Sequence, residues 1–166
     1  MYTPEDEEYY IHRDFDKKNA SHGTLFIDGA CSIGSKDEPP SNNLIIYGHN
    51  MKLGTMFHDL TKYEDESFYK DHMTFTFNTI YGRATYEVIA AFRSQVYEED
   101  SNSFKYYQFV GCDNSEAFSD YVNNVKRLTP YDIDATATYG DELITLSTCA
   151  YHTEEGRYAV VAKKVK

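Results

Sequence analysis

A cysteine near the C-terminus has the surroundings that nucleophilic chemistry requires. Cys149 ends an apolar segment, 142–148, and the polar segment 150–156 follows it. A thiol attacks a carbonyl carbon as its thiolate, so it needs a base or another means of losing its proton. It also needs a cation or backbone donors at the carbonyl oxygen, where negative charge develops. A core cysteine is the ordinary alternative, because cysteine is among the most buried residue types.

His49 and Arg157 are the candidates for the base and the cation. His49 follows the apolar segment 43–47, so its imidazole is expected to project from the end of a strand. Arg157 begins the last apolar segment, and it neighbours Cys149 if the strands on either side of the intervening turn pair antiparallel. Each residue also has an ordinary interpretation. His49 fits a hydrogen-bonded surface histidine, and Arg157 fits a salt bridge in an acidic protein.

The cysteines and histidines predict neither a disulfide framework nor a metal site. The chain has three cysteines, Cys31, Cys112 and Cys149, an odd number with wide spacing and no CxxC pair. Its six histidines form no HxH or HExxH pattern. We therefore expect at least one free thiol, core positions for Cys31 and Cys112, and neither a metal nor a cofactor.

Length and composition predict a single, mainly β domain over residues 1–166. The chain has 166 residues, 41% hydrophobic and 26% charged, which is typical of one globular domain. An aromatic content of 16% favours strands. Apolar runs and alternating patterns predict strands at 24–28, 43–48, 73–78, 83–96, 134–139, 142–148 and 157–164.

Two regions have helical spacing instead. Loosely spaced apolar residues predict one or two short helices over 56–69. A recurrence of apolar residues every three or four positions predicts a longer helix over 115–128. Asp113 and Glu116 resemble a capping box at its start.

The charge of the chain excludes one large class of partner. Sixteen Lys and Arg against 27 Asp and Glu give a formal charge of -11, which would repel a phosphate backbone, so no nucleic acid is expected. No apolar run approaches the roughly 18 residues of a transmembrane helix, and the chain does not open on the basic and then apolar stretch of a signal peptide. We therefore expect the chain as given to be soluble.

Several short blocks around the candidate residues resemble the signature of class B sortases, in the order of that family. The blocks are YIHRDF at 10–15, GTLFID at 23–28, YGHNM at 47–51, GTMF at 54–57, TLSTC at 145–149 and GRY at 156–158. The predicted helix after Cys112 is similar to the helix that class B enzymes insert between two late strands. The resemblance covers nearly the whole chain.

This resemblance implies a closed barrel of about eight strands and a cysteine transpeptidase at the extracellular face of a Gram-positive membrane. A first strand of the Gly-Trp-Ile type, expected before Tyr10, has no counterpart in the sequence, so the barrel is expected to lack it. The family's N-terminal helices and membrane anchor have no counterpart either, so the membrane is reached only through an anchor outside this chain. The loop 30–43 is longer than is typical and has no assigned role.

The resemblance also implies roles for individual residues. Cys149 resembles the nucleophile that attacks the Thr carbonyl of a sorting signal similar to Asn-Pro-x-Thr-Gly or Asn-Pro-Gln-Thr-Asn. His49 resembles the general acid for the leaving amine and then the base for the incoming one. Arg157 resembles the guanidinium that stabilises the oxyanion. The acyl group would pass from the thioester to an amine of a peptidoglycan precursor or of a pilin.

Four further residues are candidates for binding the substrate. Ser147 and Thr148 precede the thiol, and Tyr106 and Tyr107 resemble the aromatic wall that class B enzymes turn toward the peptide. The ordinary alternative for the two tyrosines is a structural role in a strand.

Two other functions are compatible with the same residues. The first is a cysteine peptidase in which water, rather than an amine, ends the cycle. The second is a non-catalytic β-barrel module that binds a peptide and uses Cys149 only as a core residue. Stimulation of turnover by an added amine separates transfer from hydrolysis, and the effect of Cys149→Ala separates both from binding.

Overall fold

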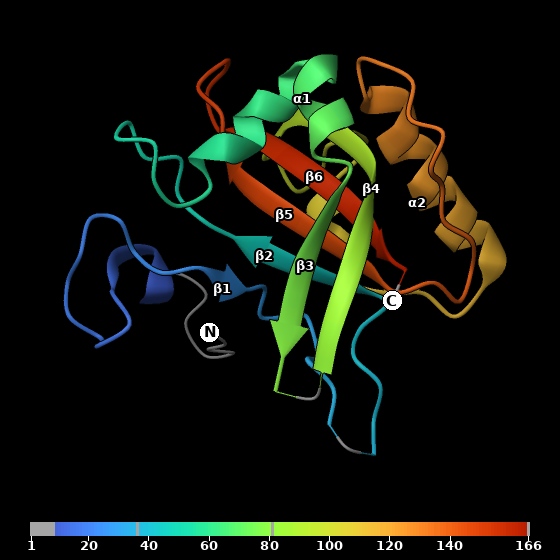
Figure 1. Cartoon of the computed structure of the whole chain (residues 1–166), viewed down its shortest axis with the longest axis horizontal. Helices are drawn as coiled ribbons and strands as arrows, with labels where there is room; N and C mark the ends of the chain where they lie inside the picture. Colours follow the sequence, from blue (N-terminus) through green and yellow to red (C-terminus); the bar gives the residue numbers. More distant parts are fainter. Residues whose placement is uncertain (1–8, 36, 81, 166) are drawn as a thin grey trace.

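Among the residues that the computed structural model describes, 9–35, 37–80 and 82–165, the chain forms one curled six-stranded sheet (Figure 1). The strands are β1 (Phe26–Ile27), β2 (Asn43–Tyr47), β3 (Thr74–Thr79), β4 (Gly82–Gln95), β5 (Leu143–Cys149) and β6 (Gly156–Lys164). Their order in space is β1-β2-β5-β6-β4-β3. β2 and β5 are parallel, and every other neighbouring pair is antiparallel.

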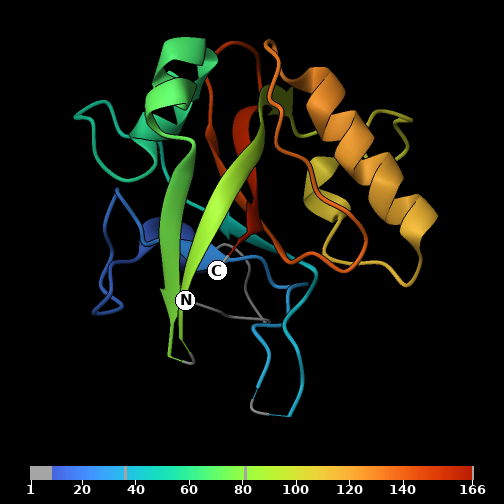
Figure 2. The same cartoon turned by 45° about the vertical axis from the view of Figure 1, so that its right-hand side comes forward.

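Helices cover both faces of this sheet. They are η1 (Tyr9–His12), η2 (His58–Glu64), α1 (Glu66–Asp71), η3 (Tyr106–Gln108) and α2 (Ser115–Leu128), where η denotes a 3-10 helix. Figures 1 and 2 show α1 and α2 on opposite sides of the central strands. Successive side chains of β6 alternate between the two faces accordingly. Ala159 and Val161 pack in the core that contains α2, whereas Val160 and Ala162 pack in the core that contains η2 and α1.

Most of the predicted elements are confirmed, with ends shifted by one or two residues. The confirmed strands correspond to the predictions at 43–48, 73–78, 83–96, 142–148 and 157–164. The strand predicted at 24–28 is reduced to the two residues of β1. The helix predicted at 115–128 has those bounds, and the helices predicted over 56–69 correspond to η2 and α1, of which α1 extends to Asp71.

The strand predicted at 134–139 is wrong. Residues 132–138 run alongside α2 without joining the sheet. The ammonium group of Lys126, in α2, donates hydrogen bonds to the carbonyl oxygens of Ile133 at 2.5 Å and of Ala135 at 2.7 Å. The Lys126 ammonium thus satisfies two backbone carbonyl groups that, in a strand, would accept hydrogen bonds from a neighbouring strand.

Two smaller expectations also need correction. The N-cap of α2 is Asn114, whose side chain accepts a hydrogen bond from the Ala117 amide at 2.9 Å, so Asp113 does not cap this helix. Cys31 is a core residue as expected, and burial raises the pKa of its thiol to about 11. Cys112 is only partly buried at the margin of the α2 core.

The eight-stranded closed barrel is not seen among the described residues. Within that part of the chain, β1 pairs only with β2 and β3 pairs only with β4, so the sheet ends at these two strands. The strand expected to be missing before Tyr10 concerns residues that lie almost entirely outside the described ranges.

The turn between β5 and β6 determines what lies opposite Cys149. Cys149 is paired with Arg157, and the ladder is closed by a hydrogen bond from the Ala150 amide to the Gly156 carbonyl at 2.9 Å. A Cβ atom at position 156 would lie 2.0 Å from the carbonyl oxygen of Ala150. Only glycine therefore allows the two strands to meet at this separation.

We expect Gly156→Ala to destabilise the fold by about 1–3 kcal/mol or more, because the added methyl group forces backbone apart in a packed turn. Chemical denaturation measures the loss. Gly82→Ala is the control, since no atom lies within 4 Å of a Cβ built there, and it should leave the denaturation midpoint unchanged. Equal stability of the two variants would contradict the steric role of Gly156.

We expect Lys126→Met to lower the free energy of unfolding by about 1.5–3 kcal/mol, because two carbonyls lose a charged donor. The same denaturation assay measures it. Lys70→Met removes an exposed lysine that pairs with Glu66 on the surface, and it should leave the midpoint unchanged. A Lys126→Met variant as stable as the wild type would show that the segment 132–138 is held by packing alone.

Candidate active site

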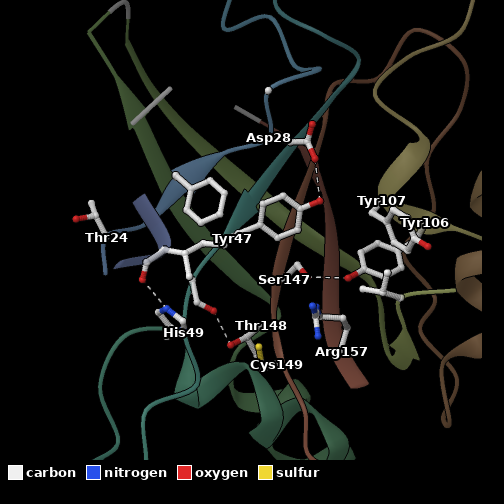
Figure 3. Close-up of a pocket in the computed structure, with 15 residues that line it drawn as sticks. Thr24, Asp28, Tyr47, His49, Tyr106, Tyr107, Ser147, Thr148, Cys149 and Arg157 are labelled. Carbon is white, nitrogen blue, oxygen red and sulfur yellow. Dashed lines mark hydrogen bonds between the residues drawn. The ribbon is translucent and has the colours of Figure 1, made fainter. Parts of the chain in front are cut away.

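Cys149, His49 and Arg157 line one cavity of about 490 Å³. β2 and β5 run parallel, so their C-terminal ends reach the same edge of the sheet. His49 follows the end of β2, Cys149 ends β5, and Arg157 is the second residue of β6. In Figure 3 the Cys149 side chain lies between the imidazole of His49 and the guanidinium of Arg157. The structure therefore brings the three predicted residues together.

Arg157 is held beside the thiol by its backbone and by two hydrogen bonds. It pairs directly with Cys149 across β5 and β6, so both side chains emerge on the same face of the sheet. Its Nη1 donates to the Gly156 carbonyl at 3.0 Å, and its Nη2 donates to Glu155 at 3.2 Å. A guanidinium has five N–H groups, so donors remain for an oxygen atom in the cavity.

His49 is oriented by the N-terminal segment. Its Nε2 lies 2.8 Å from the carbonyl oxygen of Ile11, in η1. A carbonyl oxygen only accepts hydrogen bonds, so Nε2 carries a proton. In the neutral ring Nδ1 then holds the lone pair and is the nitrogen that can exchange a proton with a reacting group. The sequence did not indicate this contact, because a residue of any type can supply a backbone carbonyl.

The predicted substrate-binding residues line the same cavity, but their hydroxyl groups have partners within the protein. The Tyr106 hydroxyl and the Ser147 hydroxyl form a buried hydrogen bond of 2.7 Å. Thr148 donates to the Gly48 carbonyl at 2.7 Å, and the Tyr107 hydroxyl accepts from the Tyr97 amide at 3.0 Å. Their role in binding a substrate stays a prediction.

Burial keeps Tyr106 neutral at the floor of the cavity. Only 1% of this residue is exposed, and desolvation raises the pKa of its hydroxyl to about 12. The phenol is therefore a hydrogen-bonding group at neutral pH and not a base.

Two residues at the far end of the cavity were missed from the sequence. The Tyr47 hydroxyl donates to the Asp28 carboxylate at 2.8 Å, and both residues line the cavity. Burial and the Asp28 charge raise the pKa of Tyr47, so it is a neutral donor. Asp28 lies in the block at 23–28 and Tyr47 in the block at 47–51, so the resemblance of these blocks to the family could have identified both residues.

In the described ranges, no group of three or more His, Cys, Asp or Glu side chains is arranged to hold a metal ion. Over those same ranges, no helix has the length and apolar character needed to cross a membrane.

Comparison with known proteins gives one consistent family. The sortase domain model matches residues 6–165. Sortase B of Listeria monocytogenes serovar 1/2a is 36% identical over 163 residues, which are 96% of this chain and 61% of that protein. The chain thus spans less than two thirds of the length of this relative.

Solved structures agree with the sequence relatives. A sortase B complexed with triglycine is 27% identical and superimposes with a TM-score of 0.83, over 100% of this chain and 73% of that one. A Staphylococcus aureus sortase B–substrate complex is also 27% identical, with a TM-score of 0.81 over 100% of this chain and 72% of that one. The chain therefore belongs to the sortase family, and its relatives and structural neighbours identify it as a class B sortase.

Proposed function

We propose that this chain is a cysteine transpeptidase that cleaves a sorting signal after Thr and transfers the acyl group to an amine. The convergence of Cys149, His49 and Arg157 on one cavity is the observation that supports this function. A thiol, an imidazole and a guanidinium at the end of a sheet provide the nucleophile, the proton carrier and the oxyanion partner of acyl transfer.

The reaction takes place in two halves. The Cys149 thiolate attacks the Thr carbonyl carbon, and the tetrahedral oxyanion lies against the Arg157 guanidinium. The C–N bond of the scissile peptide then breaks while protonated His49 gives its proton to the leaving amine. In the second half an incoming amine attacks the thioester, His49 accepts a proton from it, and the Cys149 sulfur leaves as the thiolate.

The proposed substrates are those that the resemblance to class B sortases implies, and the cavity supports them. The signal is similar to Asn-Pro-x-Thr-Gly or Asn-Pro-Gln-Thr-Asn, and Ser147, Thr148, Tyr106 and Tyr107 form the wall along which it binds. Related sortase B structures hold a substrate and triglycine, which supports a peptide donor and an amine acceptor. The acceptor amine belongs to a peptidoglycan precursor or a pilin. The reaction takes place at the extracellular face of a Gram-positive membrane.

We expect the protein to form a thioester when it is incubated with a small set of Asn-Pro-x-Thr peptides. Intact-protein mass spectrometry should show an added acyl group that Cys149→Ala lacks. Adding triglycine should increase turnover and give a new amide product. Hydrolysis that is insensitive to triglycine would favour the cysteine peptidase, and a peptide that binds without any adduct would favour the non-catalytic module.

We expect Arg157→Lys to lower kcat/KM by about 10²-fold or more, because one ammonium cannot reproduce the planar set of donors at the oxyanion. Arg93→Lys is the matched control. Arg93 also forms hydrogen bonds with a carboxylate, that of Glu64, but it is paired with Tyr158 and therefore lies on the other face of the sheet. The control should keep wild-type kcat/KM. Wild-type turnover in Arg157→Lys, with an unchanged thermal midpoint, would refute the oxyanion role.

A further inference from the structure

A side chain next to the candidate base holds the peptide group of the candidate nucleophile. Asn50 follows His49 directly, and its Nδ2 donates a hydrogen bond to the carbonyl oxygen of Cys149 at 3.0 Å. Cys149 is the last residue of β5, and the turn that follows it is exposed at 151–155. The Cys149 carbonyl therefore has a hydrogen-bond donor from outside the β5–β6 ladder.

The orientation of the Asn50 amide follows from its partners. A carbonyl oxygen accepts only, so the NH₂ group faces Cys149 and Oδ1 points to the other side. There Oδ1 lies 2.8 Å from Nδ1 of His58, which must carry a proton to make this bond. His58 begins η2, so the chain of contacts runs from η2 through Asn50 to the Cys149 peptide.

The loop that carries Asn50 is itself closed at its base. The Phe57 amide donates to the His49 carbonyl at 2.9 Å, and Asn50 forms an isolated bridge with Met56. The Tyr151 hydroxyl, from the turn after Cys149, donates to the Asn50 carbonyl at 3.3 Å. Asn50 thus joins the loop of the base to the strand end of the nucleophile.

We propose that Asn50 and His58 are positioning residues that set the distance between the Cys149 thiol and the His49 imidazole. The inference rests on the transpeptidase function proposed above. Neither residue lines the cavity that contains Cys149, so neither is placed to touch the substrate. Both act through the Cys149 carbonyl. A misplacement of reacting groups by about 1 Å can lower a rate by about 10²-fold, which makes such a contact matter for kcat.

The contact can be observed directly by NMR. Only Cys149 is followed by alanine among the three cysteines, so labelling with ¹³C′-cysteine and ¹⁵N-alanine gives one carbonyl–amide cross-peak, that of Cys149 and Ala150. Asn50→Ala and His58→Ala should move the Cys149 carbonyl resonance upfield, because the carbonyl loses or weakens its donor. His58→Asn should restore it, since the amide nitrogen of asparagine takes the place of Nδ1.

Kinetics separate positioning from a merely structural role. Asn50→Ala should lower kcat for thioester formation by about 10- to 100-fold and leave KM nearly unchanged. His58→Ala should lower kcat less, and His58→Asn should recover it. Alkylation by iodoacetamide requires the thiolate but no alignment with a bound peptide, so its rate above the pKa of the Cys149 thiol, read on the Cys149 peptide, should stay the same in all variants. His72→Ala removes another histidine bonded through Nδ1, to the Phe68 carbonyl, and is the matched control.

Each outcome has a defined meaning. An unchanged carbonyl resonance in Asn50→Ala overturns the inference, and so does a shifted resonance with wild-type kcat. If Asn50→Ala fails to fold, His58→Ala and His58→Asn make the same comparison without altering Asn50. Failure of the proposed function is distinguishable, because the wild type itself would then form no thioester with any peptide.

Discussion

The register between β5 and β6 is the constraint on which the site depends. Side chains alternate between the two faces of a sheet, so a slip of one residue would move a whole strand's set of side chains to the other face. Cys149 and Arg157 occupy opposed positions of this pair, and one step along the ladder Thr148 is paired with Tyr158, which belongs to the core with η2. A slip would expose Tyr158 and bury the guanidinium. The same burial that stabilises the fold therefore fixes the thiol beside its cation.

Covering both faces of the sheet makes this register strict. Val160 and Val161 of β6 are both fully buried, one against η2 and α1 and the other against α2. Burial of such a side chain is worth about 1.5–3 kcal/mol. A slip of one residue would exchange the two faces and place each side chain in a core that is packed for its neighbour, which costs packing energy. The inserted helix α2 therefore contributes to the site from a distance, because it covers the second face and excludes the alternative pairings.

The sequence predicted the parts of the fold that rest on periodicity. Two apolar segments around a polar turn were enough to place Arg157 opposite Cys149, and spacing by three and four predicted the bounds of the helix 115–128. The pattern over 134–139 failed because alternation does not reveal that the ammonium of Lys126 binds the carbonyls of that segment. Contacts between a side chain and a distant backbone group leave no periodic signal.

In the site, the reactive side chains could be predicted from the sequence, but the hydrogen bonds that orient them could not. Residue types and blocks indicated the thiol, the imidazole and the guanidinium, since their chemistry belongs to the side chains themselves. They did not indicate what Asn50 does, although it lies within the block at 47–51, because its partners are the Cys149 carbonyl and His58. Motifs name the residues that surround a reaction, while the hydrogen bonds that orient them require coordinates.

The position of the proton on His49 depends on residues that are distant from it in the sequence. Its Nε2 proton is fixed by the Ile11 carbonyl, so the position of η1 determines which nitrogen can act as a base. The Thr24 amide holds this segment by donating to the Tyr10 carbonyl at 2.9 Å. Gly23 has a φ of +55°, and a Cβ there would lie 2.3 Å from the Ile11 oxygen itself. A side chain at position 23 would therefore displace the acceptor of His49, so a glycine without chemistry of its own is required for the imidazole to present Nδ1 to the cavity.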